Sequence, residues 1–588
     1  MEQIKTRWFD KVDKNCPLPE YPRPQFVRDD WMNLNGKYEY RITENKTEYP
    51  KVFDGEIIVP FSVETELSGV QRPLFSDERL WYRRKFKLSR EFYGKRCILN
   101  FGAVDWKCAV YINRKLVGTH TGGYCPFSFD ITDFLKDRNE ENELSVLVYD
   151  PTDSGWQQRG KQVITSKGFW YTATSGIWKT VWLEPVNEKH IKKIRLLPDI
   201  DNSVINIETV LAGVETTDDH RLNVVIRDGD NDIYCGDISE NCDIFIPNQK
   251  LWSPESPFLY DLELTLYVGD KECDNIKSYF GMRKYSIEND KDGIPRLYLN
   301  NEPYFQRGLL DQGYYPDGGL TAPTDEAMIY DIQTMKDLGF NMLRKHIKIE
   351  PERWYYHCDK IGMIVWQDMV SGGKYIGNVL AGVLPNLKIN VKDNKYDLFS
   401  RSDPKWRENF ETELFEMIEM LYNSVSIYCW VPFNEGWGQF DAKSIAERVK
   451  AYDSSRIVDH ASGWHDQKGP DLHSIHRYIL PVPHVRNDGR PYVLSEFGGY
   501  SRIIDGHVWD KEKSFGYIMF KTRDSLTDAY EGLMKKQIMP LIKKNLCAFV
   551  YTQVSDVEFE VNGILTYDRE FIKIDPDTIK ELNAQMKY

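Results

Sequence analysis

The apolar residues of the chain follow two patterns. In the first half they form short strand-like segments, and in the second half such segments alternate with stretches that have helical spacing. Within residues 1–186, segments such as "LWYRRKFKL" (80–88) and "NELSVLVYD" (142–150) run apolar or alternate between turn sequences. This pattern is typical of an all-β sandwich. Residues 187–288 continue with about seven shorter strand-like segments, which suits an immunoglobulin-like sandwich. We therefore predict two successive β-sandwich domains.

Helical spacing of apolar residues begins after residue 300. The first predicted helix opens at the N-cap candidate Thr324 and ends at Gly339, and a second runs from Pro351 to Gly362. A third, within residues 403–423, places its apolar side chains on one face. Each predicted helix is followed by a short apolar run of the kind that forms a buried strand.

Eight such runs occur in this half of the chain, which is the number that closes a (β/α)8 TIM barrel. They are "YFQRGLL", "NMLRKH", "MIVWQD", "SIYCWVPFNE", "RIVDHAS", "LHSIHRY", "YVLSEF" and "CAFVYTQ". The link between the sixth and seventh runs is too short for a good helix. We predict that residues 289–588 form the barrel and that the C-terminal ends of its strands form the functional face.

Composition excludes several classes of function. The 588 residues carry a net charge of −14, which argues against nucleic acid or an anionic membrane as the main partner. The first 15 residues contain no apolar stretch typical of a signal peptide, and no run reaches the length of a membrane span. We therefore expect a cytoplasmic protein. The ten cysteines lie without CxxC pairs, so we expect buried free thiols.

Two glutamates share one local sequence form. Glu435 ends the apolar run of "SIYCWVPFNEGWGQFD" and Glu496 ends that of "YVLSEFGGY", and glycine follows each closely. On a closed barrel, the ends of the fourth and seventh strands face the same mouth. Two neighbouring carboxyl groups there would have different pKa values, so that one stays protonated as a general acid and the other is ionised as a nucleophile. Glycoside hydrolysis needs such a pair. The alternative is that each glutamate is a strand-end residue paired with an arginine or a backbone amide.

Aromatic residues accumulate at the same strand ends. A sugar ring binds well to such flat surfaces, which combine an apolar face with a polar edge. The candidates are Trp366, Trp430, Trp437, Trp464, Tyr500 and Tyr551. Together with the two glutamates, they favour a carbohydrate-active site over two unrelated structural carboxylates.

With these motifs the chain resembles the family 2 glycoside hydrolases, which include β-galactosidases, β-glucuronidases and β-mannosidases. The segments "FGAVDWKCAVYINRKLVGTHTGGYCPFSFDIT" and "SGIWKTVWLEPV" are similar to the family's N-terminal sugar-binding jelly roll. "LWSPESPFLYDLELTL" with "FGMRKYSI" resembles its central immunoglobulin-like sandwich, and "PFNEGWG" with "LSEFGGY" its catalytic barrel. The resemblance implies a jelly roll at 1–186, the second sandwich at 187–288 and the barrel at 289–588.

The resemblance also implies roles for individual residues. Glu435 would be the acid/base and Glu496 the nucleophile of a retaining enzyme, with the carboxyl groups about 5–5.5 Å apart. Asn434 would bind the sugar 2-hydroxyl, and Arg344 would keep Glu496 ionised. His346 is a further candidate for sugar contact, although the family spaces its histidine one residue further from the arginine.

The remaining candidates for sugar contact lie at other strand ends. Asp311 and Asp368 follow the first and third strands, where they would bind hydroxyl groups or support Arg344. His476 and Tyr478 end the sixth strand, and His476 would orient the nucleophile or the leaving group. Two aromatic residues complete the predicted substrate site: Trp464 and Tyr551.

The choice of sugar depends on a departure from the β-glucuronidase pattern. The family's Asn-x-Lys motif reads here as Asn562 followed by glycine and isoleucine, which disfavours a glucuronide unless Lys345, Lys348 or Arg569 supplies the cation. We take β-galactosidase as the default, with β-glucuronidase, β-galacturonidase or β-mannosidase as alternatives. Asp105 matches a loop that reaches the active site in some relatives, but a turn-capping role is the better interpretation. A carbohydrate-binding protein without turnover is the rival from another class.

No cofactor is required for this chemistry. The chain contains no HExxH, GxGxxG, Walker or GxSxG motif. Some family members bind Mg²⁺ or Na⁺, but the sequence identifies no metal ligands. The expected partner is a small β-glycoside or oligosaccharide, and a homo-oligomer is implied by the resemblance alone.

Overall fold

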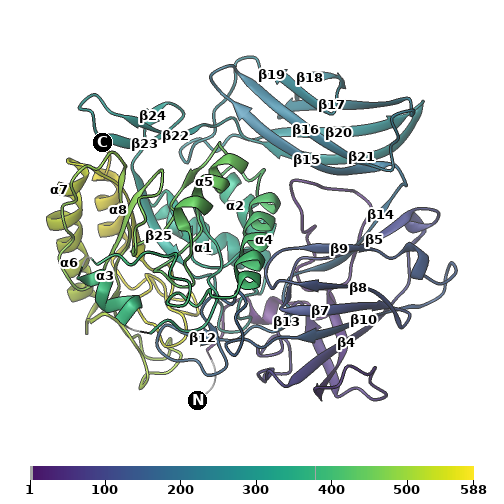
Figure 1. Ribbon diagram of the computed structural model, residues 1–588, viewed down its shortest axis with the longest axis horizontal. Helices are drawn as coiled ribbons and strands as arrows, with labels where there is room; N and C mark the ends of the chain where they lie inside the picture. Colours follow the sequence, from purple (N-terminus) through teal and green to yellow (C-terminus); the bar gives the residue numbers. More distant parts are fainter. Residues whose placement is uncertain (1–3, 378, 388) are drawn as a thin grey trace.

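The computed structural model of the protein describes residues 4–377, 379–387 and 389–588. Figure 1 shows the barrel on one side of the molecule and two β-sandwiches stacked on the other, with the central sandwich above the N-terminal one. The predicted order of a jelly roll, an immunoglobulin-like sandwich and a TIM barrel is confirmed.

The N-terminal domain packs two antiparallel sheets around one apolar core. The six-stranded sheet has the order β3 (Gly55–Val59), β2 (Gly36–Glu44), β4 (Glu78–Phe86), β10 (Asn142–Tyr149), β7 (Lys107–Ile112) and β8 (Lys115–Thr121). The four-stranded sheet has the order β1 (Met32–Asn33), β14 (Val181–Val186), β5 (Arg96–Phe101) and β9 (Phe127–Asp130). The short strands β11 (Gln162–Val163) and β12 (Tyr171–Thr172) pair apart from both sheets.

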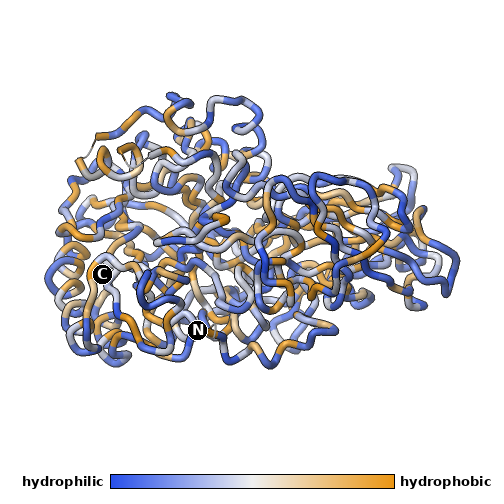
Figure 2. The backbone as a smooth tube through the Cα atoms, turned by 90° about the horizontal axis from the view of Figure 1, so that it is seen from below, coloured by the Kyte–Doolittle hydropathy of each residue, from blue (hydrophilic) through white to orange (hydrophobic). Residues whose placement is uncertain are grey.

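The central domain contains the seven strands expected of an immunoglobulin-like sandwich. One sheet has the order β15 (His190–Asp199), β16 (Val204–Ala212) and β19 (Asn241–Phe245), and the other β18 (Asn231–Ile238), β17 (His220–Asp228), β20 (Tyr260–Val268) and β21 (Lys271–Phe280). The side chains alternate in burial along β17 and β20, as half-buried antiparallel strands require. Figure 2 shows that apolar and polar positions are interspersed along the backbone of the whole molecule.

The barrel contains the eight parallel strands that the apolar runs predict. In chain order they are β25 (Gln306–Asp311), β26 (Met342–Lys345), β27 (Ile364–Asp368), β28 (Ile427–Val431), β29 (Ile457–Val458), β30 (His473–Arg477), β31 (Tyr492–Gly498) and β34 (Leu546–Thr552). The backbone ladder joins all neighbours except β29 and β30. At that seam the Ser474 hydroxyl accepts a hydrogen bond from the Gly463 backbone N–H at 3.3 Å.

The principal helices surround the barrel. They are α1 (Asp325–Asp337), α2 (Glu352–Ile361), α4 (Pro404–Met420), α5 (Ala442–Tyr452), α6 (Arg523–Leu533) and α8 (Pro576–Gln585). The Thr324 side chain caps α1 by accepting from the Ala327 N–H, and Gly362 ends α2 at φ +81°. Residues 478–491, between β30 and β31, contain no helix, as the shortness of that link predicts.

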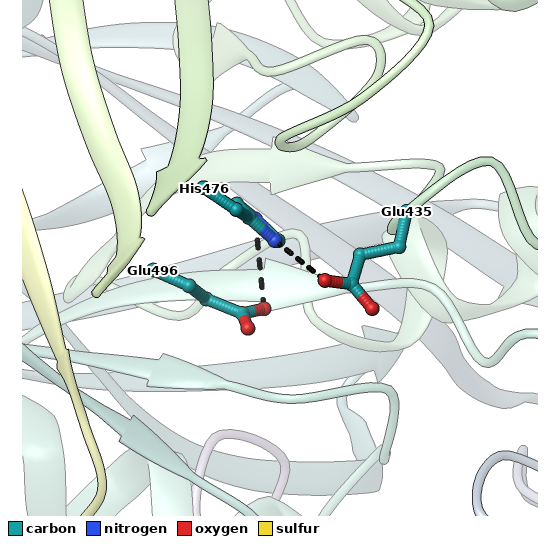
Figure 3. A group of neighbouring side chains, drawn as sticks. All are labelled: Glu435, His476 and Glu496. Atoms are coloured by element: carbon teal, nitrogen blue, oxygen red, sulfur yellow. Dashed lines mark hydrogen bonds and ion pairs between the residues drawn. The ribbon is translucent and has the colours of Figure 1, made fainter. Parts of the chain in front are cut away.

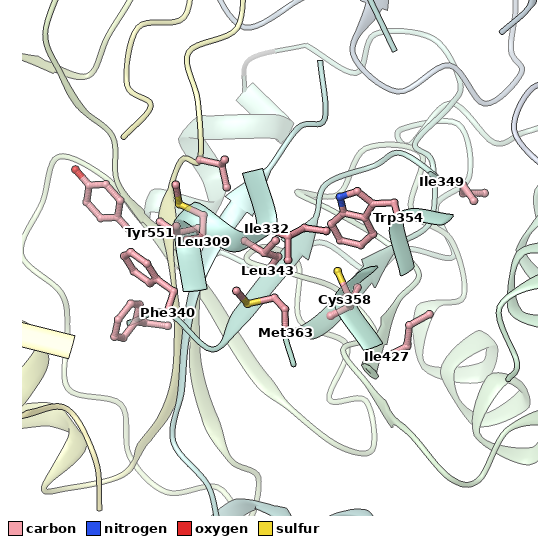
Figure 4. Packing of buried hydrophobic residues seen from close by; sticks show 14 of the residues in the cluster. Leu309, Ile332, Phe340, Leu343, Ile349, Trp354, Cys358, Met363, Ile427 and Tyr551 are labelled. Carbon is pink, nitrogen blue, oxygen red and sulfur yellow. The ribbon is translucent and has the colours of Figure 1, made fainter. Parts of the chain in front are cut away.

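Seven of the eight barrel strands bury nearly all of their residues on both faces, which explains why their sequences are largely apolar. In β30, buried and half-buried residues alternate. Leu309 and Leu343 point outward and pack with Ile332 of α1 and Trp354 of α2 (Figure 4). Their neighbours Leu310 and Met342 belong to a separate apolar cluster within the barrel. Because both clusters exclude water, the strand ends that carry polar side chains are held in fixed positions.

Candidate active site

A sharp turn places Glu435 just beyond the end of β28. The backbone of Glu435 is in the left-handed region (φ +52°), and its N–H donates to the Ser462 carbonyl at 3.0 Å. Gly436 follows at φ +70°, where an added Cβ would approach His465 Cδ2 to 2.5 Å. The glycine is therefore required by the protein's own packing against His465.

Glu496 lies within β31 and is held by a buried arginine. Arg344, on β26, donates from Nη1 to Glu496 Oε1 at 3.1 Å. The same guanidinium forms two hydrogen bonds to Asp368, at 2.9 and 3.0 Å, and one to Asn434 Oδ1 at 2.8 Å. Because Arg344 is fully buried, its position relative to all three residues is fixed.

His476 lies between the two glutamates, as Figure 3 shows. Its Nδ1 is 2.9 Å from Glu435 Oε1, and its Nε2 is 3.6 Å from Glu496 Oε1. One carboxylate oxygen of each glutamate lies within 4.8 Å of the other. The Glu435 side chain is 28% exposed and that of Glu496 is 5% exposed, so the two acids have different environments.

Charges and hydrogen bonds keep Glu496 ionised. Burial alone would raise its pKa, but the neighbouring His476 and Arg344 and the Tyr478 hydroxyl, which donates to Glu496 Oε2, outweigh this effect and lower the pKa of Glu496 to about 2. Burial, the Lys161 charge and the Arg344 charge lower the pKa of His346 well below its usual value. At neutral pH the structure therefore combines an ionised Glu496 with a neutral His346.

A cavity of about 800 Å³ opens over these residues. The predicted residues that line it are Asn434, Glu435, Glu496, His346, Trp437, Trp464, His476 and Tyr478. Asn434 presents its amide NH₂ group for a ligand, because its oxygen accepts from Arg344. The outer part of the cavity is apolar, with Leu387, Ile479 and Leu480 more than half exposed.

Other predicted site residues lie outside the cavity wall. Arg344 and Asp368 pair with each other behind it, and Asp311 pairs with Lys345 at 2.6 Å. Tyr551 is fully buried and packs against Phe497. The structure therefore gives Arg344, Asp368 and Asp311 supporting positions and places Tyr551 in the core, as it does Trp366 and Trp430.

The cations considered for a uronate are already neutralised. Lys345 and Lys348 both pair with Glu350, and Arg569 pairs with Asp331. None of the three lines the cavity, because each serves a buried ion pair elsewhere in the barrel.

Two further sequence candidates are held by hydrogen bonds outside the cavity wall. Asn562 is buried and hydrogen-bonded to Gln553 and Glu560. Asp105 is buried and accepts from Gln162 at 3.0 Å. The Asn562 side chain therefore positions Gln553 and Glu560 of the barrel, and the Asp105 side chain positions Gln162 of the N-terminal domain.

Several lining residues were not found from the sequence. Lys161, Phe169 and Trp170 come from the N-terminal domain, and Tyr517 and Glu560 come from long loops of the barrel. Trp170 packs edge-to-face on Trp437 of the barrel, with ring centres 4.7 Å apart. The aromatic cluster in "KGFWYT" is the only sequence signal for this contribution.

Two clusters of His, Asp and Glu in the described residues have metal-ligand spacing. One is the trio of Glu435, His476 and Glu496. In the other, both carboxylates, Asp466 and Asp488, already pair with Arg490. The expectation that no cofactor is required, with Mg²⁺ or Na⁺ left open, stays a prediction. Of the helices in the described ranges, none has the length and apolar character needed to cross a bilayer.

Comparison with known proteins finds relatives over most of the chain. A β-galactosidase of Thermoanaerobacter pseudethanolicus is 29% identical over 392 residues, covering 64% of this chain and 47% of the relative. A β-galactosidase of Priestia megaterium is 25% identical over 534 residues, covering 84% and 47%. The chain spans about half the length of these two curated relatives.

The similarity to two solved structures extends over almost the whole of this chain and of each matched chain. A β-D-glucuronidase of Dictyoglomus thermophilum has a TM-score of 0.74 at 18% identity, covering 96% of this chain and 99% of the other. A β-galacturonidase of Eisenbergiella tayi has a TM-score of 0.70 at 19% identity, with the same coverage. These similarities show the shared three-domain fold.

Family comparison covers the three domains in order. Residues 45–186 match the sugar binding domain of the glycosyl hydrolases family 2, and residues 189–283 match the family's second domain. Residues 295–587, which contain both glutamates, match its TIM barrel domain. The chain therefore belongs to the family 2 glycoside hydrolases.

Proposed function

We propose that this protein is a retaining exo-β-glycosidase that releases a terminal sugar through a covalent glycosyl-enzyme intermediate. The observation that carries this proposal is the carboxylate pair, in which one oxygen of Glu435 and one oxygen of Glu496 lie within 4.8 Å of each other. Retaining enzymes hold their carboxyl groups about 5–5.5 Å apart, whereas inverting enzymes leave about 6.5–9.5 Å for a water molecule. The spacing of Glu435 and Glu496 supports the retaining arrangement.

The environments of the two acids support separate roles. Glu496, ionised and buried, attacks the anomeric carbon. At the same time the bond between the anomeric carbon and the leaving oxygen breaks. Glu435, more exposed and in contact with His476, gives a proton to that oxygen. In the second step Glu435 takes a proton from water, the water oxygen attacks the anomeric carbon, and the bond to Glu496 breaks. Two inversions at one carbon give net retention.

Asn434 and Arg344 are proposed to act on the transition state. The free NH₂ group of Asn434 is placed to donate to the sugar 2-hydroxyl, a hydrogen bond that strengthens as the oxocarbenium ion develops. Arg344 fixes that amide and Glu496 together. Asn434 and Arg344 together would therefore bind the transition state more tightly than the substrate.

We take a β-galactoside as the default substrate, since the curated relatives described above carry the name β-galactosidase. β-Glucuronides and β-galacturonides are the alternatives, because the solved structures carry those names; β-mannosides also stay open. Phe169 and Trp170 wall the cavity from the N-terminal domain, which supports an exo mode of action. A cytoplasmic location and a homo-oligomer stay predictions.

The test is hydrolysis of a panel of aryl β-glycosides by the wild type, Glu496→Ala and Glu435→Gln. We expect cleavage of at least one member, with kcat falling about 10⁴-fold in Glu496→Ala. Proton NMR of the first-formed sugar should show the β-anomer. Formation of the α-anomer would exclude retention. Binding of sugar without turnover by the wild type would favour the carbohydrate-binding alternative.

A further inference from the structure

A third carboxylate, that of Glu560, faces the same cavity as Glu435 and Glu496. Glu560 lies in the loop after β34, is 2% exposed and lines the cavity wall. Tyr517 lines the same cavity as all three acids, and burial together with the charges of Glu560, Glu435 and Glu496 raises the pKa of its phenol well above the usual value. The reaction proposed above uses only two of these carboxylates.

Glu560 is held rigidly by donors from both sides of the domain interface. Asn562 donates from its amide to Glu560 Oε1 at 2.9 Å, and its own oxygen accepts from Gln553 at 2.7 Å. The Tyr171 hydroxyl, from β12 of the N-terminal domain, donates to Glu560 Oε2. A carboxylate has about four acceptor positions, so two remain for a ligand.

A fixed carboxylate beside the catalytic pair favours one kind of sugar. Its free lone pairs accept hydrogen bonds from the hydroxyl groups of a neutral sugar, and such bonds to a charged group are strong. A uronate carboxylate offers no donor at neutral pH and would be repelled by Glu560 and Glu496 together. Among the described residues, two cations line the cavity. Lys161 comes from the N-terminal domain and lies 5.5 Å from the ring centre of Tyr171, and Arg477 donates from Nε to the Pro481 carbonyl at 3.2 Å.

We propose that Glu560 is a specificity-determining residue that binds hydroxyl groups of the glycone and restricts the enzyme to neutral sugars. This inference rests on the proposed glycosidase activity and deepens it, because it selects among the sugars left open. It assigns the selection to a carboxylate fixed jointly by the barrel and the N-terminal domain.

The test uses pairs of 4-nitrophenyl β-glycosides that differ only at C6, namely galactoside with galacturonide and glucoside with glucuronide. We expect the wild type to prefer the neutral member of a pair by at least about 100-fold in kcat/KM. Glu560→Gln keeps the shape but removes the charge, and it should lower kcat/KM for the neutral member about 10- to 100-fold. The ratio of kcat/KM for the neutral glycoside to kcat/KM for the uronide should therefore be smaller in Glu560→Gln than in the wild type.

Glu558→Gln is the matched control. Glu558 is also buried in this loop and accepts from the Thr172 backbone N–H, but it does not line the cavity. The control should leave the ratio of neutral to acidic substrate unchanged. Equal effects of the two substitutions on that ratio would mean that Glu560 acts only through loop structure, which overturns the inference.

A wild type that prefers the uronide would overturn the inference. Loss of that preference in Lys161→Met or in Arg477→Met would then show which of the two lining cations binds the uronate. If Glu560→Gln does not fold, inhibition of the wild type decides: free galactose should inhibit and galacturonate should not. If the wild type cleaves no glycoside, the proposed function fails. Calorimetric binding of galactose against galacturonate then tests the inference about Glu560 separately.

Discussion

Glu496 is the residue whose chemistry depends most on its neighbours. A buried carboxylate would ordinarily take up a proton, yet here opposing charges and hydrogen bonds make the ionised form the stable one. Tyr478 is a neighbour that can be changed with little disturbance, because its hydroxyl donates to Glu496 while its ring is held by stacking on Tyr517, with ring centres 4.2 Å apart.

Replacing Tyr478 with phenylalanine should therefore weaken the nucleophile's support and leave the cavity shape intact. Loss of the donated hydrogen bond should raise the pKa of Glu496, so the acidic limb of kcat/KM should move to higher pH. We expect kcat to fall about 10- to 100-fold. The measurement is a pH–rate profile from pH 2 to 9, which includes the acidic limb expected for the wild type.

Tyr530→Phe is a suitable control for that experiment. Tyr530 is fully buried on α6, and its hydroxyl has no hydrogen-bond partner within the described ranges. Its loss should leave kcat and the pH profile unchanged. An acidic limb that stays in place in Tyr478→Phe would show that the other neighbours alone keep Glu496 ionised.

At the scale of elements, the turn after β28 is the feature that aims Glu435. An added Cβ at Gly436 would clash with His465 and would also disfavour the left-handed backbone at φ +70°. Gly436→Ala should shift the turn that carries Glu435 and lower kcat at least about 10-fold, since small misplacements of a catalytic group are costly. Steady-state kinetics with thermal unfolding would measure both effects.

Gly229→Ala is a control that has the backbone strain expected of Gly436→Ala but not its clash with a neighbouring side chain. Gly229 also has a left-handed backbone, at φ +59°, but an added Cβ there meets nothing within 4 Å. We expect it to cost about 1 kcal/mol of stability without changing kcat. A Gly436→Ala enzyme with wild-type kcat would mean that the turn absorbs the extra methyl group.

The elements also show what the sequence can and cannot predict. Glu435 and Glu496 were found because an apolar strand followed by a carboxylate is a local pattern, and a closed barrel brings all strand ends to one face. Asp311 has the same local pattern but pairs with Lys345, and sequence spacing does not reveal such pairing. Trp170 and Glu560 lie at an interface between domains, whose geometry depends on how the domains dock.

At the scale of the whole molecule, a buried arginine joins three parts of the chain. Arg28, in the segment before β1, forms an ion pair with Glu184 of the N-terminal sandwich at 3.1 Å and another with Asp274 of the central sandwich at 2.7 Å. Arg23 also pairs with Glu184, at 2.6 Å. Because all members of this network except Arg23 are less than 9% exposed, its charges should contribute strongly to domain docking.

This network makes docking of the two sandwiches sensitive to acid. Burial alone would raise the pKa of Glu184, but Arg23 and Arg28 outweigh it and hold the pKa at about 2, below the usual value of 4.5. A carboxylate with a lowered folded-state pKa stabilises the protein above its unfolded-state pKa, by about 3 kcal/mol here. That stability should be lost as the pH falls from about 4.5 to about 2.

Thermal unfolding of the wild type and Glu184→Gln between pH 7 and pH 2.5 would measure this contribution. We expect the variant to have a lower Tm at pH 7 and a smaller further loss as the pH falls, because the charge that acid would remove is already absent. Glu140→Gln, at an exposed position, should follow the wild-type curve. If Glu184→Gln also follows the wild-type curve, other carboxylates cause the acid sensitivity. The ion pairs of Arg28 would then join the sandwiches without contributing net stability, as some buried ion pairs do.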